Sequence, residues 1–186
     1  MDAGPIVRQI QYPLNGNEKA DEVLENTFLL GVKELISLLP SVWKKNMTTI
    51  IQNENEATVA PKLTVEEARV DFSHNSATQI HNKCRGFAEW PGIWSMFSIE
   101  DQQPQKIKII TTRVIESKPE TIPIENREKD VKIVKIDGIN MFRVICGDGS
   151  VLGIVELQPQ SRNIMRAKDF QNGMRGQSLR WNPCPA

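Results

Sequence analysis

The sequence predicts an α+β protein in which one long helix is followed by a linker and then by a small antiparallel β-barrel. Apolar residues recur at three- and four-residue steps over 18–39, whereas after Trp94 they recur at every second position. The segment 55–72 has few apolar side chains and is therefore expected to be the linker. With 186 residues, the chain has room for a small domain plus part of another.

Residues 1–54 are expected to form a strand over 7–14 and a helix over 18–39. Acidic residues crowd the first turn of this helix, where the helix dipole favours them. Pro40 is expected to end it, because proline has no backbone N–H to donate. The leucine-rich end of the helix, 35–39, needs a covering partner, since an exposed apolar face of this kind promotes aggregation.

A second helix is predicted just before the barrel. Asn75 or Ser76 can cap its start, and the Trp-Pro-Gly sequence at 90–92 cannot continue it. Its apolar stripe, at helical spacing, consists of Ile80, Cys84 and Phe87. Trp90 is expected to pack in the core against Phe87, the alternative being that it stacks on a base.

The barrel is predicted from short strands separated by turn residues. The expected strands are 106–115, 131–136, 141–146 and 151–157. Asp137-Gly138 is a hairpin signal, and 118–130 is expected to be a surface loop. In the first strand, alternation places Ile107, Ile109, Thr111 and Arg113 on one side. A last short helix is expected over 166–173. Barrels of the oligonucleotide-binding type have this pattern, although half of a sandwich would share it.

Three segments, taken in order, resemble one family. The segment Ile80-His-Asn-Lys-Cys-Arg-Gly-Phe-Ala-Glu-Trp-Pro-Gly92 resembles the Ile-Arg-x-Phe-x-x-Trp-Pro signature of the C-terminal domain of methionyl-tRNA formyltransferases. Residues 60–73 look like the segment that joins the two domains of these enzymes, with Phe72 where the family usually has Trp. Gly147-Asp148-Gly149, followed by Leu157-Gln158-Pro159, is similar to the close of the family's β domain.

The resemblance implies three parts. Residues 1–54 would be the C-terminal remnant of a formyltransferase catalytic domain, 55–72 the interdomain linker, and 73–186 the tRNA-binding β domain. The family transfers a formyl group from 10-formyltetrahydrofolate to the amino group of methionyl-initiator tRNA in translation initiation. Its partner would therefore be that tRNA. The folate is expected only for the intact enzyme, and no cofactor is expected for this chain alone.

Asp2 would carry the one catalytic role. Met1-Asp2-Ala3-Gly4-Pro5-Ile6 resembles the family's Asp-x-Gly-x-Ile motif, whose aspartate is catalytic. The family's Asn-x-His segment has no counterpart, because neither His74 nor His81 has an asparagine two residues before it. Acyl transfer needs a proton acceptor and a polarising donor held together. We therefore expect the chain to be inactive alone. The hypothesis is a truncated product or incomplete gene model that begins at an internal methionine.

The charge distribution favours an RNA partner. Residues 1–72 carry 7 basic and 11 acidic side chains, whereas residues 73–186 carry 16 basic and 12 acidic ones. A basic half of this kind suits a phosphate backbone, although it is also compatible with an ordinary solvated surface. The candidate tRNA contacts are Lys62, Lys83, Arg85, Arg113, Arg143, Arg162 and Arg166.

Cysteine usage and hydropathy exclude other classes. The three cysteines have no Cys-x-x-Cys spacing, which argues against a zinc site and a disulfide scaffold, so no metal is expected. Cys84 and Cys146 are expected to be buried. No apolar run of about 18 residues and no opening signal peptide is present. We expect a monomer without membrane contact. The resemblance implies a mitochondrion or plastid in a eukaryote and the cytoplasm in a bacterium.

Two other functions remain open from the sequence. The chain could be a non-catalytic module that binds RNA or protein. It could also belong to a formyltransferase that acts on a nucleotide sugar or another amine, because such enzymes carry related C-terminal domains. Sequence upstream of Met1 separates the first alternative from an enzyme by showing whether the folate site exists.

Overall fold

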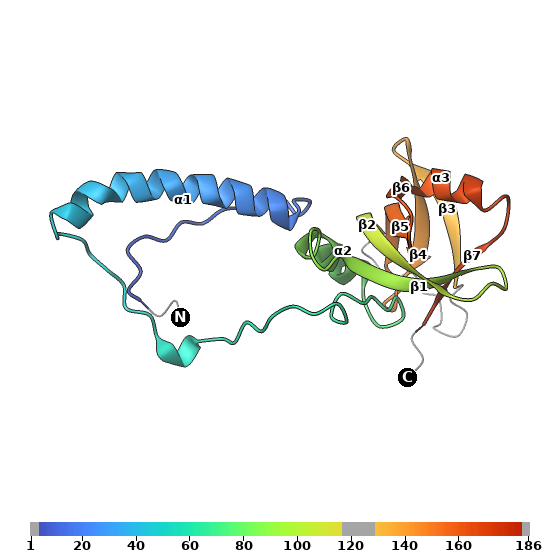
Figure 1. Cartoon of the computed structure of the whole chain (residues 1–186), viewed down its shortest axis with the longest axis horizontal. Coiled ribbons are helices and arrows are strands. Elements are labelled where there is room, and N and C mark those ends of the chain that lie inside the picture. Colours follow the sequence, from blue (N-terminus) through green and yellow to red (C-terminus); the bar gives the residue numbers. More distant parts are fainter. Residues whose placement is uncertain (1–3, 117–128, 184–186) are drawn as a thin grey trace. The chain divides into compact units, whose positions relative to one another are not determined.

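The computed structural model describes residues 4–116 and 129–183 of the chain (Figure 1). It divides into two compact units, Met1–Lys62 and Leu63–Ala186. The division falls within the segment 55–72 that was expected to be the linker. The last part of that segment belongs to the second unit, where Ala68, Val70 and Phe72 are buried.

The first unit contains the helix α1, Ala20–Trp43, and a single 3-10 turn, Glu54–Glu56. The strand expected over 7–14 is not formed. Instead, Ile6 and Ile50 make one isolated bridge, with two backbone hydrogen bonds of 2.8 Å each. A β-strand is stable only when a neighbouring strand accepts and donates its backbone hydrogen bonds. Among the described residues of this unit, only Ile50 exchanges such backbone hydrogen bonds with the N-terminal segment.

Helix α1 continues past Pro40, so the expectation that this proline ends the helix was wrong. Proline removes only its own N–H, and its carbonyl still accepts a 3.2 Å hydrogen bond from the Lys44 amide in the last turn. No residue of α1 is buried, and Ile36 is 62% exposed. None of the helices in the described residues combines the length and apolar character needed to cross a bilayer.

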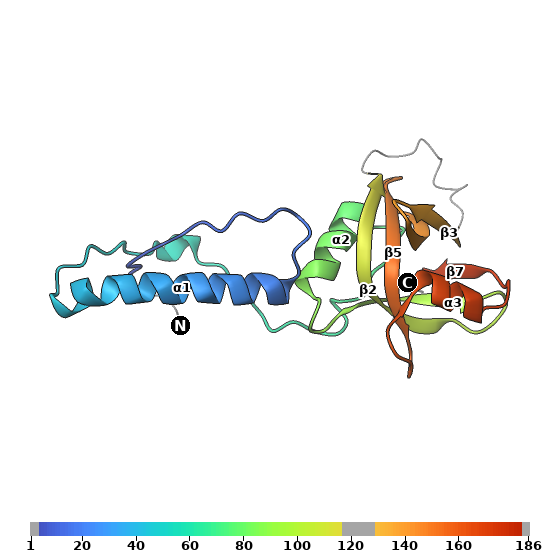
Figure 2. The same cartoon turned by 90° about the horizontal axis from the view of Figure 1, so that it is seen from above.

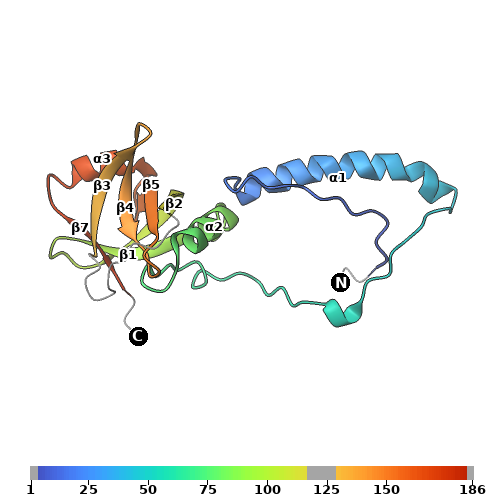
Figure 3. The same ribbon diagram turned by 180° about the vertical axis from the view of Figure 1, so that it is seen from behind.

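The second unit is built on a closed antiparallel barrel, which confirms the predicted α+β fold with a small barrel. Its strands are β1 Ile93–Ile99, β2 Gln105–Glu116, β3 Asp130–Ile136, β4 Ile139–Ile145, β5 Val151–Pro159, β6 Met165–Arg166 and β7 Leu179–Asn182. The order is β2-β1-β7-β3-β4-β5, and β5 pairs back onto β2 to close the barrel, with β6 added along β5. Figure 3 shows β3, β4 and β5 from behind.

Two short helices complete the core of this unit (Figure 2). Helix α2, Ala77–Gly86, buries Ile80 and Cys84 against the barrel, as its spacing predicted. Helix α3, Ala167–Gly173, places Phe170 edge-on to Phe142 of β4, with ring centroids 6.0 Å apart. The interior void lined by the core side chains measures only about 10 Å³, which is at most the size of one water molecule. The barrel is therefore packed rather than hollow.

Several local predictions are confirmed. Ser76 caps α2 by accepting a 3.1 Å hydrogen bond from the Gln79 amide. Asp137 and Gly138 both have positive φ and join β3 to β4, with Ile136 paired to Ile139. Cys84 and Cys146 are buried. The expected loop over 118–130 lies almost wholly outside the described residues.

Three expectations were wrong or incomplete. The strands β1 and β7 were not predicted. In β2, irregular pairing between Ile109 and Thr112 shifts the alternation, so Thr112 rather than Thr111 is buried. Trp90 is 53% exposed, and the neighbouring Pro91 is buried instead, so the expected core position of Trp90 was wrong.

Candidate nucleic-acid interface

Among the described residues, the barrel interior leaves no room for a ligand, so a binding site on the barrel must lie on its outer surface. In β1 and β2, the inward face is apolar, with Ile93 opposite Ile109. Residues at the alternate positions face outward. Lys106 and Lys108 of β2 occupy two of these outward positions.

Three cations lie around one tryptophan, Trp94, on this outer surface, and a fourth, Lys83, is hydrogen-bonded to the segment that carries one of them. The Lys106 ammonium lies 4.0 Å from the centroid of the Trp94 ring, and the Arg69 guanidinium carbon lies 5.3 Å from it. Both are within the range of cation–π attraction. Lys108 is directly opposite Trp94 in the β1–β2 register and therefore shares its face. We call Arg69, Lys83, Trp94, Lys106 and Lys108 the Trp94 cluster.

Lys83 connects α2 to this cluster. Its ammonium donates a 3.1 Å hydrogen bond to the Arg69 carbonyl and lies 5.8 Å from the centroid of the Phe87 ring. Partial burial lowers the pKa of Lys83, and the nearby carboxylate of Glu67 opposes that shift. Lys83 is thus held in place and only partly hydrated, which strengthens its attraction to an anion.

Arg113 and Arg143 are brought together by strand pairing. Both are in register with Gly153 of β5, which lies between their strands, and Lys132 of β3 is in register with Arg143. Residues in register share a face of the sheet, and neighbouring strands are about 4.8 Å apart. The backbones of the two arginines, which are two strands apart, are therefore separated by about 10 Å. The row Arg113–Gly153–Arg143–Lys132 is a second basic feature of the barrel.

Arg162 and Arg166 differ in their surroundings. The side-chain amide of Gln158 donates a 2.9 Å hydrogen bond to the Arg162 carbonyl, and Gln158 is in register with Lys108. Arg162 therefore belongs to a loop held beside the Trp94 cluster. Arg166 is in register with Glu156, an acid, and this carboxylate also accepts a 2.6 Å hydrogen bond from Thr111.

The remaining predicted site residues are not brought into either group. Arg85 is two residues from Lys83, which on a helix turns it about 200° away, and its guanidinium donates a 2.8 Å hydrogen bond to Asn82. Lys62 is exposed and is the last residue of the first unit. Asp2 lies outside the described residues.

Sequence reasoning missed Arg69, Lys106, Lys108 and Lys132. The alternation of lysine and isoleucine over 106–109 does indicate that both lysines share one face. It does not reveal that Trp94 lies opposite them, because that requires the pairing of β1 with β2.

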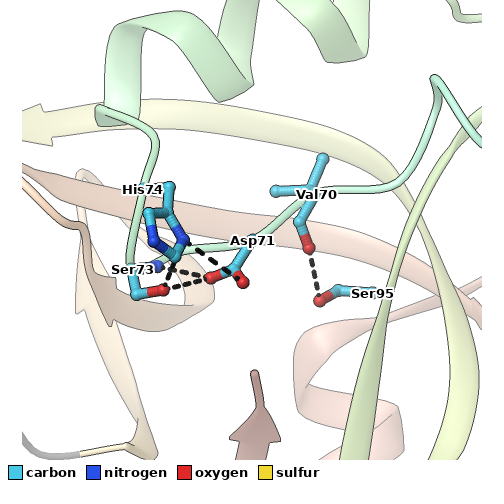
Figure 4. A network of polar contacts seen from close by, with 5 residues as sticks. All are labelled: Val70, Asp71, Ser73, His74 and Ser95. Carbon is cyan, nitrogen blue, oxygen red and sulfur yellow. Dashed lines mark hydrogen bonds and ion pairs between the residues drawn. The ribbon is translucent and has the colours of Figure 1, made fainter. Parts of the chain in front are cut away.

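A polar network fixes the chain between Arg69 and α2 (Figure 4). The Asp71 carboxylate accepts hydrogen bonds from the amide and hydroxyl of Ser73, and the His74 imidazole lies 3.5 Å from it. Burial raises the pKa of Asp71, but the Ser73 hydrogen bonds and the imidazole outweigh it, so the pKa is lowered overall. The hydroxyl of Ser95 donates to the Val70 carbonyl at 2.8 Å.

This segment then docks on the turn between β4 and β5. The Gly147 amide donates to the Asn75 carbonyl at 3.2 Å, and the Ala77 amide donates to the Ser150 hydroxyl at 2.8 Å. Phe72 packs edge-on to Phe97 and Trp181, at 6.0 and 5.7 Å between ring centroids. The anchored segment places Arg69 and Lys83 at fixed positions relative to Trp94.

The structure thus defines a small, tightly packed β-barrel domain. Among its described residues, the groups described above that could contact a ligand are cations on the outer surface of the barrel. The family described as "Formyl transferase, C-terminal domain" matches residues 62–175. The chain therefore belongs to the formyltransferase family through this domain, as the sequence motifs indicated.

Two curated proteins illustrate the similarity of this chain to methionyl-tRNA formyltransferases. A methionyl-tRNA formyltransferase of Enterococcus faecalis is 32% identical over 181 residues, covering 96% of this chain and 52% of that protein. One from Acidobacterium capsulatum is 30% identical over 173 residues, covering 93% of this chain and 51% of that protein. The chain thus spans about half the length of the curated relatives it matches.

Solved structures support the fold. HypX from Aquifex aeolicus, as a multiple variant, covers all of this chain and 30% of its own, with a TM-score of 0.60 and 16% identity. The N-formyltransferase from Helicobacter canadensis, in complex with folinic acid and dTDP-3-aminofucose, covers 86% of this chain and 51% of its own, with a TM-score of 0.56 and 18% identity. At these identities the likeness concerns the fold alone.

Proposed function

We propose that this chain binds initiator tRNA through the outer surface of its barrel, as the RNA-binding part of a methionyl-tRNA formyltransferase. The observation that carries the proposal is similarity to methionyl-tRNA formyltransferases over 93–96% of the chain. The cations of the Trp94 cluster and of the row Arg113–Gly153–Arg143–Lys132 support it. Phosphates are contacted by Lys and Arg, and these contacts position an RNA without reading its sequence.

Formyl transfer itself is proposed for the intact family proteins and not for this chain alone. HypX from Aquifex aeolicus has been solved with tetrahydrofolic acid, which supports a folate-type cofactor in the family. The barrel is filled, and its two histidines are engaged elsewhere, His74 with Ser73 and His81 with Thr112 at 2.9 Å. Asp2 keeps the catalytic position proposed for it from the family motif.

The test uses fluorescence anisotropy to measure how tightly the whole chain binds initiator tRNA at several salt concentrations. We expect binding that weakens steeply with salt, because each phosphate contact releases counterions. The double reversal K83E/R85E should weaken it further. A matched control, K44E/K45E, changes the net charge equally but lies in the first unit, on exposed residues that follow α1.

The result that would overturn the proposal is a folded sample that fails to bind tRNA at low salt, or binding that K83E/R85E leaves unchanged. A parallel assay with 10-formyltetrahydrofolate addresses activity. We expect no formylation of methionyl-tRNA by the chain alone, and turnover would contradict that part. Formylation or tight binding of a dTDP-amino sugar, with no tRNA binding, would favour a formyltransferase acting on another amine.

A further inference from the structure

Helix α1 has two apolar sides, and the described residues cover only one of them. Residues 6–12 lie against that side, where they line a groove together with Leu30 and Leu38. The other side carries a stripe of large apolar side chains, of which Phe28 is 67% exposed. A helix that is apolar on more than one side is normally buried within a larger structure. The open stripe of α1 is therefore a surface that needs a partner.

The stripe has the spacing of a helix that pairs with another helix. Its positions alternate steps of four and three residues, and this spacing keeps one line of side chains facing a partner helix. These five positions, which we call the α1 seam, are Phe28, Val32, Leu35, Leu39 and Val42. Two exposed apolar side chains, Leu24 and Ile36, lie beside the seam. The stripe thus offers an edge-to-edge apolar surface to a second helix.

Charged residues mark the two ends of the seam differently. The same spacing continues backward from Phe28 to Glu25 and Asp21, so the seam begins with two carboxylates. Residues 18–25 carry four acidic side chains and one basic one, whereas residues 38–45 carry two lysines and no acid. The helix is therefore acidic at its start and basic just past its end.

This charge pattern selects the partner and its direction. Two copies of α1 that run in the same direction would place Glu25 beside its own counterpart, and like charges repel. When they run in opposite directions, Phe28 of one copy can lie opposite Leu39 of the other. The same alignment brings Glu22 level with Lys45 of the second copy, and the opposite ends of the two helix dipoles lie together. A second copy in the antiparallel direction therefore matches both the seam and the charges.

A membrane surface matches the stripe less well. Helices that lie on membranes carry lysines and arginines on their polar side. Lys33 is the one basic residue of α1, all of which is described. Asp21 and Glu25, at the start of the seam, would be repelled by anionic headgroups.

We propose that the chain forms a homodimer in which two copies of α1 pair in the antiparallel direction through the α1 seam. This inference goes beyond the proposed tRNA binding and does not depend on it. A monomer was expected from the sequence, whereas the exposed seam and the charges at its two ends argue for two copies. Burial of two facing rows of apolar side chains provides the driving force.

The experiment measures the molar mass of the whole chain by sedimentation equilibrium between about 1 and 100 µM. We expect a mass that approaches twice the 21.1 kDa of one chain. The double substitution F28E/I36E should raise the dissociation constant at least about 100-fold, because it buries charges without partners. The matched control, N26E/S37E, adds the same charge to exposed positions about 200° around the helix from Phe28 and Leu35. It should change the dissociation constant less than about threefold. Circular dichroism verifies that every variant keeps its helix content.

Disulfide cross-linking tests the direction of the two helices. The background is a Cys184→Ser chain, in which the remaining cysteines, Cys84 and Cys146, are buried. Glu25→Cys and Val42→Cys chains are oxidised separately and as a mixture. We expect the cross-linked dimer in the mixture, because the antiparallel alignment places position 25 opposite position 42. A cross-link in Glu25→Cys alone would overturn the antiparallel direction.

Other outcomes overturn the dimer itself. These are a monomer over the whole concentration range, a mass that grows without limit, and a dimer that F28E/I36E leaves unchanged. A monomer that binds the part of the Enterococcus faecalis methionyl-tRNA formyltransferase that this chain does not cover would assign the stripe to that partner instead. Binding of the monomer to phosphatidylserine vesicles would assign it to a membrane surface. None of these measurements contains RNA, so the proposed function is tested separately.

Discussion

Gly147 packs against the backbone carbonyl of Ser73 so closely that a β-carbon at position 147 would overlap the carbonyl oxygen. The contact joins the segment before α2 to the turn after β4, residues far apart in the sequence. The obstructing atoms belong to the backbone, so they cannot rotate away as a flexible side chain could. Only glycine allows this docking, on which the positions of Arg69 and Lys83 depend.

The first prediction follows from this contact. We expect Gly147→Ala to lower the free energy of unfolding by about 2–3 kcal/mol, because either the lead-in segment or the turn must shift to admit the methyl group. Urea unfolding measures the change. Gly173→Ala is the control, since nothing lies within 4 Å of a β-carbon there, and it should change stability by less than about 1 kcal/mol. Equal effects of the two substitutions would contradict the packing.

A second prediction concerns Asp71 and acid. Its pKa in the folded chain is lowered below the ordinary 3.8, so ionised Asp71 contributes stability above that value, and the contribution is lost as pH falls through the folded pKa. We expect Asp71→Asn to cost about 1–2 kcal/mol near neutral pH, because hydrogen bonds from Ser73 to a charged acceptor are replaced by weaker ones.

The pH dependence distinguishes this charge effect from a loss of shape. The difference in unfolding free energy between the wild-type chain and Asp71→Asn should shrink below pH 3.8, where the wild-type carboxylate takes up its proton. Urea titrations at pH 7, 5 and 3 measure it. A difference that stays constant over this range would show that the ionised form of Asp71 plays no part.

A third prediction separates stability from binding at Lys83. Burial lowers its pKa below 10.5, so the unfolded chain binds more protons than the folded chain between the two pKa values, and stability rises with pH there. Lys83→Met keeps the apolar stem against Phe87 but removes this titration. We expect a stability change within about 1 kcal/mol at pH 7 and a loss of the alkaline rise.

The same variant should nevertheless bind tRNA less tightly, because it removes a fixed cation from the Trp94 cluster. Lys135→Met, on the exposed side of β3, serves as the control for lost charge. Unchanged tRNA affinity in Lys83→Met, in a chain of normal stability, would remove Lys83 from the proposed surface. Its role would then be structural, through the 3.1 Å hydrogen bond to the Arg69 carbonyl.

What the sequence predicted correctly depends on short-range chemistry. Helix α2 was found because its cap, its apolar spacing and its stop all lie within the short segment 76–92, and the Asp137-Gly138 hairpin was found from two residues. Strand β7 was missed because its alternation of apolar and polar residues covers only four positions, and it gains its stability from pairing with β1 and β3. The strand predicted over 7–14 shows the converse, a suitable sequence without a partner to pair with.

The candidate site shows the same limit. Charge counts and family motifs indicated which half of the chain would meet RNA and named Lys83 and Arg162. They could not show that Lys83 and Arg85 diverge around α2, or that Arg166 lies opposite Glu156. Arg69 and Lys106 meet only because Trp94 lies between the lead-in and β2. Such groupings come from strand register, which composition does not encode.

The last prediction concerns two tryptophans that lie in opposite environments. Trp90 is 53% exposed, whereas Trp181 is 6% exposed and packs on Phe72. We expect Trp90→Ala to change the free energy of unfolding by no more than about 0.5 kcal/mol, and Trp181→Ala to cost about 3–5 kcal/mol. Urea unfolding, monitored by far-ultraviolet circular dichroism, measures both changes in stability without relying on tryptophan fluorescence.

If Trp90 is free to stack on an unpaired base, its removal should weaken RNA binding although the fold is intact, since stacking contributes about 1–3 kcal/mol per base. Trp90→Phe retains an aromatic face and should recover part of that affinity, which a loss of general surface contact would not explain. A large loss of stability in Trp90→Ala would restore the core position that the sequence indicated. Unchanged affinity in both Trp90 variants would leave the cations as the sole proposed contacts.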